Sequence, residues 1–166
     1  LSELAGHVTG LMGANGYRVS GQTVNMVLEG IDVADPVSPD RNVEVTVGGK
    51  TRRSRYTEVM LGATSSEGEW ADVGECYAYP LEWVQSSEEA SDQIYINWLG
   101  IKGEYRGKGW GRYLLLRTLW EAQRIGYKHC VLGTDGTNYR AQIFYTNYGY
   151  RVTHTANAYT KILTKS

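Results

Sequence analysis

A short cationic segment rich in glycine offers the clearest chemistry in this sequence. Residues 106–112 read Arg-Gly-Lys-Gly-Trp-Gly-Arg, between a predicted strand and a predicted helix. Glycine lets the backbone adopt positive φ and approach a ligand closely. The free N–H groups and the dipole of a helix N-terminus attract anions, and the Arg and Lys side chains add positive charge. The segment therefore predicts a cradle for a phosphate or pyrophosphate group.

Three phosphate-binding patterns compete for this segment. A Walker A loop needs G-x-x-x-x-G-K-[ST], which the chain lacks. A dinucleotide fingerprint needs G-x-G-x-x-G and an acidic residue about 20 residues later, and neither the spacing nor a suitable carboxylate is present. The third pattern, Arg/Gln-x-x-Gly-x-Gly/Ala, is matched by Arg106, Gly109 and Gly111.

The elements that must position this segment follow from hydrophobic periodicity and from turn residues. Strands are expected at 17–29 (with a turn or bulge at Ser20-Gly21), 42–48, 56–63, 70–81, 94–101, 128–134, 150–154 and 158–163. Helices are expected at 2–14, 110–125 and 138–148, the last with Asn138 as its N-cap. Residues 30–41 should form a loop or linker. Antiparallel-looking strands followed by a strand–helix–strand–helix–strand run predict a mixed α/β sheet.

Composition and charge narrow the class of protein. The chain has 166 residues, 42% of them hydrophobic, and a net charge of −1, which fits one folded domain or one domain plus a fragment. The balanced charge argues against a nucleic-acid or membrane partner. The basic turn with Lys50, Arg52, Arg53 and Arg55 is better interpreted as a solvated surface.

The cysteines and the start of the chain bear on its compartment. Two cysteines, Cys76 and Cys130, are too few for a disulfide scaffold and predict buried free thiols. No apolar run is long enough for a transmembrane helix, and the start does not resemble a signal peptide. These features predict a cytoplasmic protein.

Two blocks of the sequence resemble the GNAT superfamily of N-acetyltransferases. The family pattern L-x-V-x-P-E-Y-R-G-x-G-I-G-x-x-L-L is matched by Leu99, Ile101, Glu104, Tyr105, Arg106, Gly107, Gly109, Gly111, Leu114 and Leu115. A later pattern, N-x-x-A-x-x-x-Y-x-x-x-G-F/Y, is matched by Asn138, Ala141, Tyr145, Gly149 and Tyr150. The resemblance covers about residues 70–166. It implies a GNAT-like acyl-CoA N-acyltransferase fold, α/β with a splayed central sheet, that uses acetyl-CoA as co-substrate and no metal.

The resemblance also implies roles for particular residues. Tyr145 would be the general acid for the leaving thiolate, close to the thioester sulfur. Asn138 would touch the pantetheine arm, and backbone groups of Leu99, Gly100 and Ile101 would pair with the pantetheine and the acetyl carbonyl. The residues expected to hold the pyrophosphate are Arg106, Gly107, Lys108, Gly109, Trp110, Gly111 and Arg112.

The sequence does not identify the general base. Family members that carry a glutamate on the strand before the loop would place it at Tyr95, which is not a carboxylate. Glu75, Tyr95 itself, Asn97 through an ordered water, and Asp92 are the candidates.

The domain organisation departs from the family. The sequence Gly-Tyr-Arg-Val occurs at 16–19 and again at 149–152, each time after a helix-like stretch. We interpret residues 1–30 as the tail of a preceding GNAT-like unit and residues 31–166 as the acyltransferase domain of a tandem-domain protein. Alternatively, residues 2–14 supply a helix to the same domain in a rearranged order. The two family helices that usually shape the acceptor pocket do not fit between residues 48 and 56.

Two functions are compatible with this sequence. The first is an N-acetyltransferase that acts in a ternary complex on a primary amine of a small molecule or peptide. The alternative is a catalytically degenerate CoA-binding accessory domain, suggested by the missing helices and by the missing carboxylate.

Overall fold

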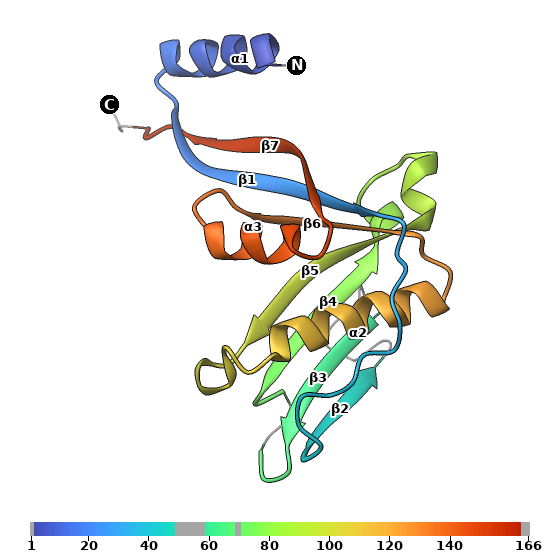
Figure 1. Ribbon diagram of the computed structural model, residues 1–166. Coiled ribbons are helices and arrows are strands. Elements are labelled where there is room, and N and C mark those ends of the chain that lie inside the picture. Colours follow the sequence, from blue (N-terminus) through green and yellow to red (C-terminus); the bar gives the residue numbers. More distant parts are fainter. Residues whose placement is uncertain (1, 49–58, 69–70, 164–166) are drawn as a thin grey trace. The chain divides into compact units, whose positions relative to one another are not determined.

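The computed structural model (Figure 1) describes residues 2–48, 59–68 and 71–163 of the chain. The helices are α1 (Ser2–Ala14), α2 (Trp110–Arg124) and α3 (Tyr139–Thr146), with short 3-10 helices η1 (Leu81–Trp83), η2 (Glu88–Asp92) and η3 (Gly103–Tyr105). The strands are β1 (Arg18–Glu29), β2 (Val43–Gly48), β3 (Val59–Ser65), β4 (Gly74–Pro80), β5 (Gln93–Ile101), β6 (His129–Asp135) and β7 (Arg151–Thr160). The predicted order of helices and strands is confirmed from α1 to α3. The basic turn at 49–55 and the expected strand residues 56–58 lie outside the described residues.

The strands form a mixed sheet in the order β2-β3-β4-β5-β6-β1-β7. Strands β2, β3, β4 and β5 pair with one another in antiparallel fashion, and β6 runs parallel to β5. The crossover between the parallel strands contains α2, as a strand–helix–strand unit requires. The predicted mixed α/β sheet is therefore present.

The chain divides into two compact units. One contains Leu1–Met26 together with Gly133–Ser166, and the other contains Val27–Leu132. The first comprises α1, most of β1, the end of β6, α3 and β7. The second comprises β2 to β5 and α2, which are joined into one core.

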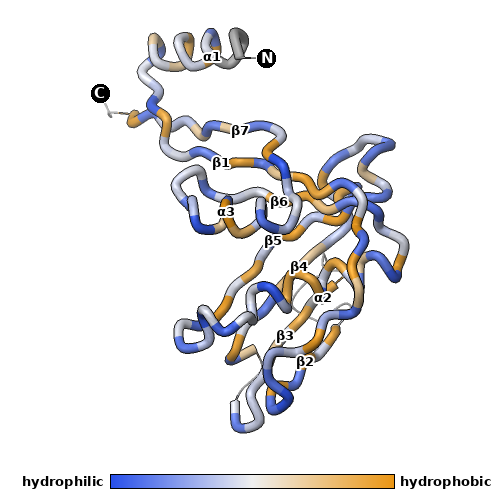
Figure 2. Tube along the Cα trace, in the orientation of Figure 1, coloured by the Kyte–Doolittle hydropathy of each residue, from blue (hydrophilic) through white to orange (hydrophobic). Residues whose placement is uncertain are grey.

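In the Val27–Leu132 unit, α2 packs across β3, β4 and β5. Its buried face includes Leu114, Leu115, Leu119 and Ala122, the apolar side of an amphipathic helix. Alternate residues of β4 are buried, which places one face of that strand against the helix. In Figure 2, hydrophobic residues mark β3 and the middle of α2, whereas the loop between β5 and α2 is mostly hydrophilic.

Both cysteines belong to the interior. Cys76 and Cys130 are free and fully buried, which confirms the prediction. Burial raises the pKa of the Cys76 thiol to about 12. Cys76 is therefore a packing residue and not a thiolate nucleophile.

The predicted loop 30–41 runs as an extended strap beside α2. The Val33 N–H donates to Gln123 Oε1 at 3.1 Å, and Asp35 pairs with Arg117 at 3.0 Å. Arg117 also pairs with Glu121, and its guanidinium carbon lies 4.5 Å from the centre of the Trp120 ring. The strap is therefore held against α2 by a hydrogen bond and an ion pair.

Two expected interruptions are absent in the other unit. Strand β1 continues through Ser20-Gly21 without a turn, and the two strands expected at 150–154 and 158–163 form one strand, β7. The Gln22 side chain donates to Asn157 Oδ1 at 3.0 Å, and Thr153 Oγ1 donates to the Asn25 carbonyl at 3.2 Å. Contacts between residues 20–25 of β1 and residues 153–158 of β7 keep polar and glycine positions extended, although local propensity alone favours turns there.

Candidate functional site

The glycine-rich segment forms the turn from β5 into α2. Gly107 and Gly109 have φ values of 76° and 89°, in the left-handed region that favours glycine. Gly109 is the N-cap residue of α2, and no side chain caps this end of the helix. Trp110 is 2% exposed and anchors the first turn in the core. The sequence therefore builds a rigid helix start whose first N–H groups remain available to an anion.

Cationic side chains surround this helix start. Arg106 Nε donates to the Ile101 carbonyl at 3.1 Å, which ties the loop back to the end of β5. The Lys108 ammonium lies 5.5 Å from the centre of the Tyr105 ring. Lys102 and Arg112 are also at this end of β5 and α2, and Lys102 is exposed. The loop thus has the positive charge that the sequence predicted for it.

Strand β5 carries an irregularity just before this loop. Trp98 pairs with Tyr77 and Ile96 pairs with Ala78, so Asn97 is the extra residue of a β-bulge. The register of β5 with β6 covers Gln93–Ile96 only. From Asn97 to Ile101, that side of β5 has no register partner among the described strands. Its backbone N–H and C=O groups can therefore pair with an extended ligand.

A carboxylate and several aromatic rings share the face of β4 and β5 that is turned away from α2. Trp98 Nε1 donates to Glu75 Oε1 at 3.1 Å, and the Tyr77 hydroxyl donates to Glu75 Oε2. Further along, the rings of Tyr79 and Tyr95 lie 5.2 Å apart, and burial together with Tyr95 raises the pKa of Tyr79. Two base candidates, Glu75 and Tyr95, are therefore on one face.

Tyr77 and Trp98 were missed at the sequence level. The alternation of β4 places Tyr77 beside Glu75 and could have revealed it. No pattern in the neighbouring residues could have revealed Trp98, because the bulge at Asn97 decides which face of the sheet its side chain occupies.

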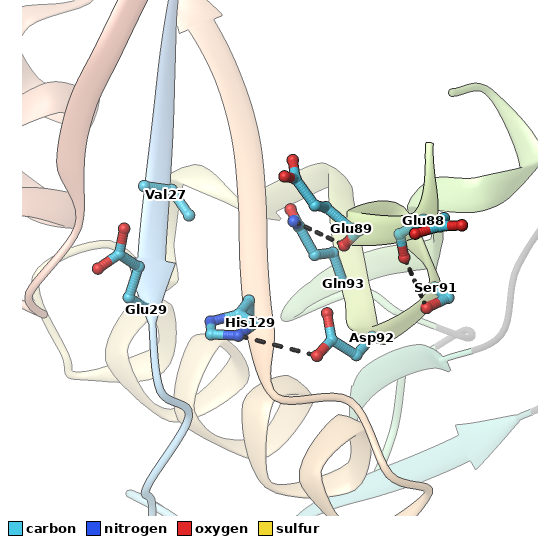
Figure 3. Close-up of a pocket in the computed structure, with 8 residues that line it drawn as sticks. All are labelled: Val27, Glu29, Glu88, Glu89, Ser91, Asp92, Gln93 and His129. Carbon is cyan, nitrogen blue, oxygen red and sulfur yellow. Dashed lines mark hydrogen bonds and ion pairs between the residues drawn. The ribbon is translucent and has the colours of Figure 1, made fainter. Parts of the chain in front are cut away.

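Asp92, another base candidate, lies elsewhere. It precedes β5, whereas the glycine-rich loop follows the other end of that strand, roughly 30 Å away for nine extended residues. Asp92 Oδ2 is 3.9 Å from His129 Nε2 and 3.6 Å from Lys128 Nζ. It lines a pocket of about 490 Å³ with Val27, Glu29, Glu88, Glu89, Ser91, Gln93 and His129 (Figure 3). Among the described residues, no group of acidic, His and Cys side chains is arranged to hold a metal ion.

A second hollow lies between the strap and the start of α2. It has a volume of about 550 Å³, and Gly109, Arg112, Tyr113 and Leu116 line it on the side of the helix. Residues 33–37 and Pro39 form the opposite wall. Arg112, one of the predicted pyrophosphate ligands, therefore faces a cavity.

Asn138 and Tyr145 belong to the other unit, where both lie on α3 or at its start. Asn138 is the N-cap, and its Oδ1 accepts the Ala141 N–H at 3.2 Å, as predicted. Tyr145 is 8% exposed, and its ring centre lies 5.2 Å from that of Phe144 and 5.4 Å from that of Tyr150. An aromatic cluster therefore fixes the tyrosine ring in orientation.

Comparison with known protein families identifies the family to which this chain belongs. Residues 68–152, just over half of the chain, match the family described as Acetyltransferase (GNAT) domain. No curated protein matches the sequence. No helix among the described residues combines the length and the apolar character needed to cross a membrane.

Several solved structures share the fold. A GCN5-related N-acetyltransferase from Sphaerobacter thermophilus is 18% identical with a TM-score of 0.66, over 92% of this chain and 55% of that one. A GNAT-family protein from Novosphingobium aromaticivorans is 17% identical with a TM-score of 0.61, over 89% of this chain and 69% of that one. A tandem GNAT protein of the clavulanic acid biosynthesis pathway is 12% identical with a TM-score of 0.63, over 89% of this chain and 57% of that one. The chain thus spans little more than half of the first and last of these proteins, and the likeness establishes the fold.

Proposed function

Because this chain belongs to the GNAT acetyltransferase family, we propose that it transfers an acetyl group from acetyl-CoA to a primary amine. The observation that carries the proposal is the glycine-rich loop. Its left-handed Gly107 and Gly109 open a helix whose N-terminus has no side-chain cap and is surrounded by cations. This arrangement suits the pyrophosphate of CoA. Residues Arg106–Arg112 would hold it.

The proposed reaction needs orientation more than strong acids or bases. Acetyl-CoA supplies the acetyl group as a thioester. Successive N–H groups of a strand point to opposite edges, so within Leu99, Gly100 and Ile101 the alternate N–H groups on the edge of β5 that lacks a register partner would orient and polarise the thioester carbonyl. The amine nitrogen attacks the carbonyl carbon, the carbon–sulfur bond breaks, and the amine releases its proton to solvent. The products are the N-acetyl amine and CoA.

Tyr145 on α3 and Asn138, the N-cap of that helix, have the remaining roles in the proposed reaction. The Tyr145 hydroxyl gives its proton to the departing thiolate and regains one from solvent. Asn138 keeps its side-chain oxygen on the helix cap, while its N–H₂ group, which has no partner among the described residues, donates to the pantetheine arm.

The remaining base candidates are assigned by their surroundings. Both oxygens of Glu75 already accept hydrogen bonds from Trp98 and Tyr77, so we give Glu75 a binding role, argued below. Tyr95 stays the candidate for relaying the amine proton to water, since it lies on the same face of β4 and β5 as Glu75. The two buried free thiols favour a reducing cytoplasm as the place of the reaction.

Calorimetric titration with acetyl-CoA tests the proposal. We expect binding in the micromolar range, and turnover, measured as release of the CoA thiol, with at least one amine of a broad panel. Absence of binding up to about millimolar acetyl-CoA would exclude the function. Binding without turnover of any amine would favour the accessory-domain alternative.

We also propose that residues 1–30 are the tail of a preceding GNAT-like unit. The position of β1 between β6 and β7 in the sheet supports this proposal, as does the repeated Gly-Tyr-Arg-Val sequence. We expect the amides of β1 to exchange with deuterium as slowly as those of β7, because strand pairing protects both. Fast exchange throughout β1 would show a frayed segment that has no place in the fold.

A further inference from the structure

The carboxylate of Glu75 is held by neutral donors only. The Trp98 indole N–H donates to one oxygen at 3.1 Å, and the Tyr77 hydroxyl donates to the other. Within residues 2–48, 59–68 and 71–163, no Lys, Arg or His forms an ion pair with Glu75. The negative charge is therefore oriented, and no cation of the described chain balances it.

Glycines make room around this carboxylate. Glu75 stands opposite Gly62 on β3 and opposite Gly100 on β5, so neither neighbouring strand places a side chain directly opposite it. A Cβ atom at Gly100 would lie 2.8 Å from Trp98 Nε1. Glycine at this position therefore lets the indole lie over the strand and reach Glu75. Trp98 remains 52% exposed, so a ligand can reach the ring.

This combination selects a positive charge. Indole and phenol rings attract ammonium groups through their π faces, and a carboxylate adds direct attraction. An amine bound here would stay protonated, because a nearby negative charge favours the charged form. A protonated amine has no lone pair for attack on a thioester. The group that this cluster holds is therefore not the group that reacts.

We infer that Glu75, Tyr77 and Trp98 bind a second, positively charged group of the acceptor, so that the preferred acceptor is a diamine or a polyamine. The inference rests on the proposed acetyl transfer. Glu75 stands opposite Gly100, within the stretch of β5 proposed to hold the thioester, so a short aliphatic chain is enough to join the held ammonium to the amine that reacts.

Matched acceptors test the inference. With acetyl-CoA saturating, we expect kcat/KM for 1,5-diaminopentane to exceed that for pentylamine about tenfold, equivalent to about 1.4 kcal/mol. Tetramethylammonium, which cannot be acetylated, should compete with the diamine and not with the monoamine. In Glu75→Gln the diamine/monoamine ratio should fall toward one, and in Trp98→Leu it should fall severalfold.

Control measurements separate this inference from the proposed function. Glu82→Gln removes an exposed carboxylate on η1 and should keep the wild-type ratio. The inference is overturned if the diamine/monoamine ratio of the wild type is near one, or if Glu75→Gln leaves that ratio intact. In either case, acetyl-CoA binding and turnover of the monoamine would still support the proposed acetyl transfer. If acetyl-CoA does not bind, the function fails. Calorimetric binding of the diamine alone then decides the cation site: it must weaken at least about tenfold in Glu75→Gln, and equal affinity refutes the site.

Discussion

Tyr145→Phe should lower kcat about a hundredfold and leave the Kd for acetyl-CoA unchanged. General acid catalysis typically contributes a factor of this size or more. Phenylalanine keeps the ring that packs against Phe144 and Tyr150, and removes only the proton donor. Rapid-mixing measurement of thiol release, with calorimetry for acetyl-CoA, checks both halves of the expectation.

The neighbouring Tyr148 provides the matched control for this variant. It lies just beyond α3, and its ring packs 5.1 Å from that of Phe144. Tyr148→Phe removes a hydroxyl from the same aromatic cluster, and we expect turnover within about twofold of the wild type, since no proton transfer involves it. Equal turnover of Tyr145→Phe and Tyr148→Phe would show that Tyr145 is not the general acid.

Arg106→Ala should raise the Kd for acetyl-CoA by about tenfold or more. The change removes a cation beside the proposed pyrophosphate and the hydrogen bond to the Ile101 carbonyl that ties the loop to β5. Hydrogen bonds to charged groups contribute roughly 1.5–3 kcal/mol, and solvent exposure of Arg106 favours the lower end. Arg106→Lys should lie between the wild type and Arg106→Ala, because lysine keeps the charge and loses the geometry.

Salt and a distant arginine test whether the loss is local. Arg124 is exposed and ends α2, whereas the loop precedes the start of that helix, so Arg124→Ala removes the same net charge away from the loop. We expect its Kd to stay close to the wild-type value. The difference between the wild type and Arg106→Ala should shrink at high ionic strength, as screening weakens the charge term. Identical affinities of Arg106→Ala and Arg124→Ala would mean that the loop does not bind the pyrophosphate.

Local patterns predicted much of the fold. The apolar stripe of α2, the Asn138 cap of α3 and the order of strands and helices all depend on residues a few positions apart. The expected turn at Ser20-Gly21 and the expected break near Thr155 are both absent. In the folded chain, residues 20–25 of β1 and residues 153–158 of β7 contact each other, and those contacts hold both segments extended.

The sequence by itself determined the chemistry of the loop before α2. Its glycines and cations act through positions within one turn of backbone, so their spacing is enough to predict a helix start suited to an anion. Only the tertiary structure decided which base candidates lie together and which lies at the other end of β5. The bulge at Asn97 places Trp98 beside Glu75, and strand direction sends Asp92 to the opposite end of β5. Strand register and bulges arise from contacts between segments far apart in the chain, and a shift of one residue moves a side chain to the other face.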